Sequence, residues 1–118
     1  QLKSSGEHYK SLLMQSLGDR LVEAASEWLH EQVRKKLWGY SPAESLTVKD
    51  MYQAAYQGIR PAVGYPSLPD QKTIFPLAEL LDLGKIGITL TENGAMYPQA
   101  SVCGLYIASR HAKYFVIK

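Results

Sequence analysis

Residues 58–70, GIRPAVGYPSLPD, limit the fold of this chain more than any other segment. The segment holds three prolines and two glycines, which are Pro61, Pro66, Pro69, Gly58 and Gly64. Because proline fixes φ and lacks an N–H, the segment cannot continue a helix or a central strand. The pattern predicts a stiff, extended loop with exposed backbone amides and one cation, Arg60. Such a loop loses little entropy on binding a ligand, although a purely structural connection has the same composition.

The residues before this loop have helical periodicity. From about residue 8 to residue 38, apolar side chains recur every four positions, which predicts one long amphipathic helix. Gly39 is expected to end that helix in the left-handed conformation. A second helix is predicted over residues 48–56, with Thr47 and Asp50 forming a capping box at its start.

After residue 70 the chain changes from helical to strand patterns. The sequence PLAELLDLG predicts a short helix with Pro76 in its first turn and Gly84 just past its end. Three later segments, IGITLTE, VCGLYIAS and KYFVIK, read as strands, and the last two are expected to form a hairpin through residues 109–112. The expected fold is therefore α+β, with a long amphipathic helix and shorter helices packed on a small twisted antiparallel sheet.

Composition excludes several classes of function. The chain is 46% apolar and 20% charged, as in ordinary globular domains, and its formal net charge of +2 is too small to indicate nucleic-acid binding. The basic run Arg34-Lys35-Lys36 lies at a helix end, where cations complement the macrodipole. No apolar stretch is long enough to span a membrane. The single cysteine, Cys103, reads as a small buried hydrophobe and favours a reducing compartment, so a cytoplasmic protein is expected.

Other short patterns do not amount to catalytic or metal sites. His30 and Glu31 begin like the metalloprotease motif H-E-x-x-H, but position 34 is arginine, so no metal site is expected. The glycines at 84 and 87 are too close together for a phosphate loop or a dinucleotide fingerprint. A Rossmann-type methyltransferase is therefore excluded.

Four blocks in a fixed order resemble the S-adenosylmethionine-binding activation domain of cobalamin-dependent methionine synthase. They are DRLVEAASEWLHEQVRKKLWGY, YQGIRPAVGYPSLPD, the L-T-E and A-M-x-P segment of LTENGAMYP, and ASVCGLYIASRHAKYF. GIRPAVGYP is similar to the family's RPAPGYP signature, with Val63 in place of its second proline. Since the family domain is larger, the resemblance implies that residues 1–118 are part of a single activation domain within a longer polypeptide.

The resemblance also implies a site for S-adenosylmethionine (AdoMet) built from Arg60, Ala62, Tyr114, Phe115 and Glu23. Arg60 would take the ligand carboxylate, because a guanidinium matches a carboxylate in a bidentate manner. Ala62 would contribute its backbone, and Tyr114 would contact the ligand beside Phe115, where the family often has a second tyrosine. Glu23 would take the amino group or a ribose hydroxyl, although its helix position alone indicates a solvated face.

Two further residues, Tyr65 and Asp19, resemble residues that contact the cobalamin-binding domain. They would face the corrin ring and its displaced histidine ligand. No catalytic residue is expected in this chain, because a sulfonium is already an activated methyl donor and positioning is the main contribution of the protein.

The implied function is reactivation of a vitamin B12-dependent methionine synthase, which makes methionine from homocysteine and 5-methyltetrahydrofolate. AdoMet would be held over cobalamin that has been oxidised to Co(II), so that one-electron reduction by flavodoxin or a similar flavoprotein is trapped by methyl transfer. Cobalamin would be bound by a neighbouring domain, and zinc by the homocysteine domain of the parent enzyme. The alternative is a stand-alone AdoMet-sensing or partner-binding module without catalysis.

Overall fold

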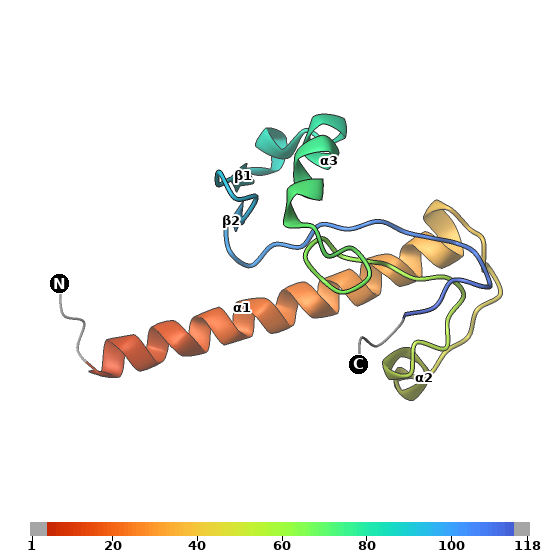
Figure 1. Cartoon of the computed structure of the whole chain (residues 1–118). Coiled ribbons are helices and arrows are strands. Elements are labelled where there is room, and N and C mark those ends of the chain that lie inside the picture. Colours follow the sequence, from red (N-terminus) through yellow and green to blue (C-terminus); the bar gives the residue numbers. More distant parts are fainter. Residues whose placement is uncertain (1–4, 115–118) are drawn as a thin grey trace.

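One long helix supports the rest of the chain. A computed structural model describes residues 5–114 (Figure 1), and the predicted last strand therefore lies largely outside the described residues. Helix α1 (Ser5–Gln32) continues into a π-helical turn, η1 (Val33–Leu37). Gly39 then ends the helix with φ of 75°, and its N–H donates to the carbonyl of Val33 at 3.0 Å. The predicted glycine terminus is confirmed.

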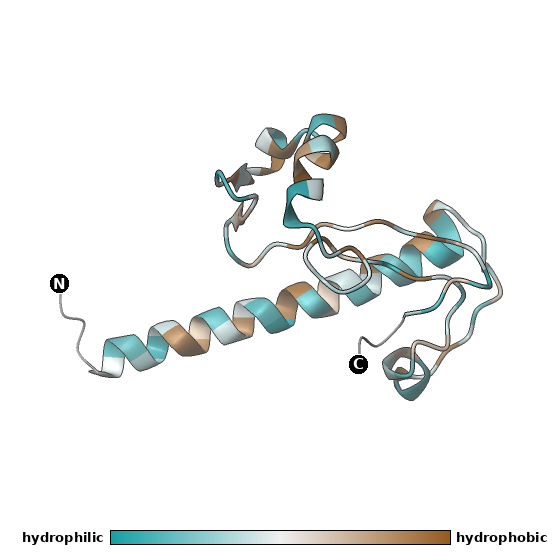
Figure 2. Cartoon of the chain, viewed as in Figure 1, coloured by the Kyte–Doolittle hydropathy of each residue, from teal (hydrophilic) through white to brown (hydrophobic). Residues whose placement is uncertain are grey.

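The first turns of α1 project away from the other elements (Figure 1), and the apolar stripe of the helix is exposed. Leu13, Leu17 and Leu21 are 51%, 53% and 61% exposed. Figure 2 shows hydrophobic turns along this projecting part of the helix. An amphipathic helix normally buries its apolar stripe. Among the described residues, the apolar stripe is buried only at Val33, where α1 continues into η1. No described helix is long and apolar enough to cross a membrane.

The second helix is shorter than predicted. Helix α2 (Val48–Tyr52) begins with the expected capping box, in which the Thr47 N–H donates to Asp50 Oδ2 at 2.9 Å and the Asp50 N–H donates to Thr47 Oγ1 at 3.2 Å. The predicted extension to residue 56 is wrong, because Ala54 takes a left-handed φ of 51° and stops the helix.

A third group of helical turns follows the signature loop. It comprises η2 (Gln71–Thr73), α3 (Ile74–Leu80) and η3 (Leu83–Ile86). Pro76 lies in the first turn of α3, as predicted, and Ile74 is fully buried. The expected role of Gly84 is wrong, since it lies inside η3 and Gly87, with φ of 76°, provides the left-handed end.

Regular sheet structure is limited to two short strands. β1 (Thr89–Leu90) and β2 (Met96–Tyr97) pair antiparallel, with Leu90 opposite Met96. The α+β class with a small antiparallel sheet is confirmed, but IGITLTE forms a strand over only two residues.

The signature segment pairs with the segment predicted as a strand at VCGLYIAS. Isolated antiparallel bridges join Ile59 to Ile107 and Ala62 to Gly104. A continuous strand does not form there, because Pro61 has no N–H to contribute to the ladder. The predicted exposure of the signature amides is only partly right, because several of these N–H groups are bonded within the chain. The N–H of Ile59 donates to the Ile107 carbonyl at 2.9 Å, and that of Val63 donates to the Cys103 carbonyl at 2.8 Å.

Val63 gives a structural meaning to the one departure from the family signature. Its side chain is among the few buried apolar groups of the described chain, and its N–H makes the 2.8 Å bond to Cys103. A proline at this position could not make that bond. The valine therefore adds one backbone bond that fixes the signature segment against residues 102–107.

Candidate functional site

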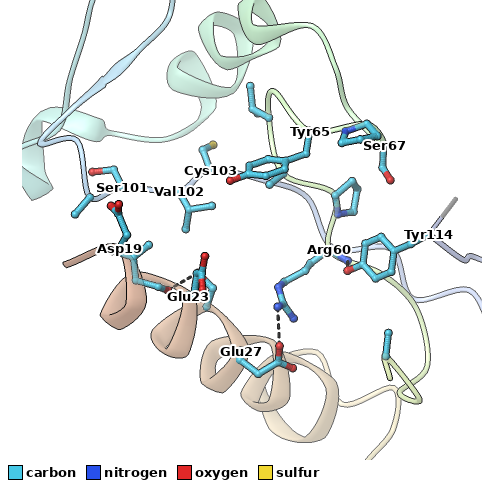
Figure 3. A pocket seen from close by; sticks show the side chains of 18 of the residues that line it. Asp19, Glu23, Glu27, Arg60, Tyr65, Ser67, Ser101, Val102, Cys103 and Tyr114 are labelled. Atoms are coloured by element: carbon cyan, nitrogen blue, oxygen red, sulfur yellow. Dashed lines mark hydrogen bonds and ion pairs between the residues drawn. The ribbon is translucent and has the colours of Figure 1, made fainter. Parts of the chain in front are cut away.

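An open cavity of about 840 Å³ lies between α1, the signature segment and residues 96–103. Six residues singled out from the sequence line it: Asp19, Glu23, Arg60, Ala62, Tyr65 and Tyr114. Figure 3 shows Asp19, Glu23 and Glu27 along α1, with Arg60 and Tyr65 on the opposite side. Phe115 lies outside the described residues. The structure thus gathers these six side chains around one space, and the role of each stays a prediction.

The wall of the cavity that α1 supplies is acidic. Asp19, Glu23 and Glu27 are four residues apart, so they lie on one face of the helix, one turn above another. Glu23 is highly exposed, and its one ion pair within residues 5–114 is a 3.7 Å contact with Arg20. Both sequence-based interpretations of Glu23 therefore describe part of its position, because it is solvated and also lines the cavity. Glu27 was missed, although the four-residue spacing pointed to it.

Arg60 is anchored to α1 by two contacts. Its Nη2 donates to Glu27 Oε2 at 2.6 Å, and its Nη1 lies 2.9 Å from His30 Nδ1. Burial alone would lower the pKa of Arg60, but the hydrogen bond and charge of Glu27 outweigh burial and raise it. Arginine has five N–H donors, and these two contacts engage only part of the fork. The other side-chain donors have no partner within residues 5–114.

His30 is a neutral, fully buried imidazole. Burial lowers its pKa from 6.5 to about 3, and the charges of Arg34 and Arg60 act in the same direction. Because a guanidinium can only donate, the Nδ1 of His30 is the acceptor and its proton is on Nε2. That Nε2 has no partner among the described residues, and neither does Glu27 Oε1. The sequence analysis considered His30 only as part of a failed metal motif.

Tyrosines surround His30 and Arg60. The ring of Tyr56 meets His30 edge-on at 4.7 Å, and the ring of Tyr106 lies 5.3 Å away. The hydroxyl of Tyr114 accepts the backbone N–H of Arg60 at 2.7 Å and lies 3.5 Å from the hydroxyl of Tyr56. Burial and the neighbouring Tyr114 raise the pKa of Tyr56, so the phenol of Tyr56 is protonated at neutral pH.

The basic run at the end of the helix is only partly a solvated terminus. Arg34 is completely buried, and its Nε and Nη2 bond the two carboxylate oxygens of Glu44 at 2.6 and 2.9 Å. Its guanidinium also lies 4.3 Å from the centre of the Tyr56 ring. The predicted position of the basic run at a helix end is confirmed, because Arg34, Lys35 and Lys36 lie in the last turn of η1. The buried pair of Arg34 with Glu44 was not predicted from the sequence. Lys35 does pair with Glu31, at 3.7 Å, across one turn.

Backbone groups of the signature segment also face the cavity. The Ala62 carbonyl accepts from the Tyr65 N–H at 3.1 Å, whereas the Ala62 N–H has no protein partner in the described part of the chain. The close approach of Gly104 keeps this stretch in place, since a Cβ there would lie 2.5 Å from the Pro61 carbonyl oxygen. Cys103 is half-buried and lines the cavity, so the prediction of a buried core position was only partly right.

The arrangement suits binding better than proton transfer or hydrolysis. A guanidinium, three carboxylates, aromatic rings and a free N–H surround the cavity. Cys103 is the only thiol, and burial raises its pKa, which reduces its nucleophilicity. Within residues 5–114, no group of three histidine, cysteine or acidic side chains is placed to hold a metal ion.

Comparison with known proteins relates this chain to one family of domains. The family model described as "Vitamin B12 dependent methionine synthase, activation domain" matches residues 1–118. A solved structure, "Crystal Structure of the MetH Reactivation Domain bound to AdoHcy", is similar to this chain with a TM-score of 0.88 and 44% sequence identity. The match covers 93% of this chain and 34% of that one. The chain therefore spans about a third of the length of this solved relative.

Proposed function

Because this chain belongs to the family of vitamin B12-dependent methionine synthase activation domains, we propose that its cavity binds S-adenosylmethionine. The observation that carries the proposal is that Arg60 and a row of carboxylates face the same cavity. AdoMet has one carboxylate and two positive centres, an ammonium and a sulfonium, so it complements both walls. The relative bound to AdoHcy supports the same ligand class.

The residues present fit this ligand. The cavity of about 840 Å³ lies within the usual size of small-molecule sites, roughly 300–1,000 Å³. Arg60 has N–H donors left to bind the ligand carboxylate, and the exposed Glu23 can accept from the ammonium or a ribose hydroxyl. The free Ala62 N–H can read an acceptor on the ligand, and Tyr114 lies beside Arg60. We extend the ligand contacts to Phe115 on the basis of family resemblance.

We propose that these residues act by binding and orienting AdoMet, with no acid, base or nucleophile of their own. The neighbouring domain would hold cobalamin, which supplies the nucleophile for the methyl group once it is reduced by one electron. The S–CH3 bond of AdoMet would break, and S-adenosylhomocysteine would be the leaving group. Tyr65 and Asp19 line the same cavity and would contact that domain. Orientation of a methyl donor that is already activated is a sufficient contribution to rate.

We also propose that residues 1–118 are one part of a single activation domain in a longer, cytoplasmic polypeptide. The exposed leucines of α1 and the greater length of the solved relative support this view. The parent enzyme would methylate homocysteine with 5-methyltetrahydrofolate, carry zinc in its homocysteine domain, and accept electrons from flavodoxin or a similar flavoprotein.

Recovery of oxidised enzyme tests the proposal. The protein that carries this chain, with its cobalamin as Co(II), is mixed with AdoMet, with a low-potential electron donor, or with both, and followed by visible spectroscopy. Methylcobalamin is expected only with both, because the sulfonium methyl needs a reduced nucleophile. Tyr65→Ala should slow this recovery and leave turnover of active enzyme unchanged. Binding of AdoMet without spectral recovery would favour a sensing or partner-binding module instead.

A further inference from the structure

We propose that His30 and Glu27 are positioning residues, which hold the guanidinium of Arg60 in one plane so that its remaining donors meet the carboxylate of the ligand. This inference rests on the proposed function, because it concerns how Arg60 would recognise AdoMet. Neither residue was singled out as part of a ligand site by sequence, and both act through Arg60.

The geometry supplies two separate anchors for one planar group. Glu27 Oε2 accepts a hydrogen bond from Arg60 Nη2 at 2.6 Å, and His30 Nδ1 accepts one from Arg60 Nη1 at 2.9 Å. Both ends of the guanidinium are therefore fixed. Both anchors come from α1, whereas Arg60 belongs to the signature segment, 30 and 33 residues along the chain. With two points held, rotation of the guanidinium about its last torsion is blocked.

His30 is itself held in place, as a positioning residue has to be. It is fully buried, and the rings of Tyr56 and Tyr106 lie 4.7 and 5.3 Å from the imidazole centre. Its acceptor nitrogen is fixed by the guanidinium, which has no acceptor of its own. Glu27 adds a charge-assisted bond, which is about twice as strong as a neutral one.

This arrangement lowers the entropic cost of binding. An unanchored arginine would lose several rotamers when it grips a carboxylate, and that loss weakens binding. Removal of one anchor should therefore raise the dissociation constant by roughly three- to tenfold, for ligands that present a carboxylate. Ligands without a carboxylate should be unaffected, because they do not use the fork.

The experiment compares AdoMet with decarboxylated AdoMet, which keeps the adenosine, sulfonium and amine. Titration calorimetry is run on the protein that carries this chain and on His30→Leu, His30→Asn, Glu27→Gln and Glu31→Gln. His30→Leu removes the acceptor and should weaken AdoMet by roughly three- to tenfold, with decarboxylated AdoMet unchanged. His30→Asn offers Oδ1 near the place of Nδ1 and should restore most of the affinity. Glu31→Gln, which changes a half-buried carboxylate of the same helix that lies outside the cavity lining, should alter neither ligand.

Equal weakening of both ligands in His30→Leu and Glu27→Gln would overturn the inference, because it would show a general structural role. Unchanged binding of AdoMet in both variants would overturn it as well. If His30→Leu does not fold, Glu27→Gln carries the test. Because Glu27 also belongs to the acidic wall of the cavity, both ligands should weaken in this variant, and AdoMet should weaken by the larger factor. Failure of the unaltered protein to bind AdoMet would instead refute the proposed function, before any variant is compared.

Discussion

The hydroxyl of Tyr114 accepts the backbone N–H of Arg60 at 2.7 Å, across 54 residues of sequence. This bond attaches the C-terminal part of the described chain to the signature segment, at the residue that carries the guanidinium. Tyr114 therefore supports Arg60 from the backbone side, while Glu27 and His30 hold its side chain. Tyr114 is also one of the residues for which a ligand contact is predicted.

Tyr114→Phe should lower stability and weaken AdoMet binding. Loss of the hydroxyl leaves the Arg60 N–H without its partner, which costs about 1 kcal/mol for a neutral hydrogen bond. The midpoint of urea unfolding and the calorimetric dissociation constant would measure the two effects. Tyr97→Phe is the matched control, because Tyr97 is highly exposed and lies outside the cavity lining. An unaltered unfolding midpoint in Tyr114→Phe would contradict the role of this bond.

Arg60→Ala should raise the dissociation constant for AdoMet by about tenfold or more, since charge-assisted bonds contribute roughly 1.5–3 kcal/mol. Arg60→Lys should be nearly as harmful, because an ammonium cannot bond a carboxylate at two points. Calorimetry on variants with unchanged circular dichroism would measure the effect. Full affinity in a folded Arg60→Ala protein would show that the carboxylate is bound elsewhere.

Stability should fall as the pH is lowered, and His30 should account for part of the slope. The pKa of His30 is lowered from 6.5 to about 3 by burial and by Arg34 and Arg60, so in that window the unfolded chain binds the additional proton. The stability contributed by the neutral imidazole is therefore complete above pH 6.5 and is lost toward pH 3, at up to about 1.4 kcal/mol per pH unit. Urea unfolding at pH 7 and pH 5 would show a smaller difference in His30→Asn. An identical difference in both proteins would mean that His30 titrates normally.

Gly104→Ala should destabilise the chain and loosen the signature segment. Its Cβ would lie 2.5 Å from the Pro61 oxygen and 3.1 Å from the Ala62 Cα, and overpacking of this kind costs roughly 1–3 kcal/mol. The melting temperature and AdoMet affinity should both fall. Gly6→Ala, where no atom lies within 4 Å of the new Cβ, should raise stability slightly, because alanine is the better helix former. Equal melting temperatures for the two variants would refute the tight contact.

Local signals in the sequence predicted local structure well. The Gly39 terminus, the capping box of Thr47 and Asp50, and Pro76 in a first turn were all readable, because each depends on residues within one or two turns. The length of α2 could not be predicted, because Ala54 is an alanine in the sequence and still takes a positive φ.

The candidate site was predictable in part, through the family signature rather than through spacing. Arg60, Glu23 and Tyr114 do line one cavity, but the partners of Arg60 on α1 lie 30 and 33 residues away and required the tertiary structure. The four-residue spacing of Asp19, Glu23 and Glu27 was present in the sequence. The leucine stripe on the same helix predicted a different inward face, because an apolar stripe is normally the face that a helix buries.

Helix α1 presents carboxylates on one face and leucines on another, and the two faces turn together because they belong to one helix. One carries the carboxylates of Asp19, Glu23 and Glu27 toward the cavity, and the other carries exposed leucines. Any element that packs on those leucines would set the rotation of α1 about its own axis. It would thereby aim all three carboxylates together, so the fit of a ligand in the cavity depends on contacts made on the far side of the helix.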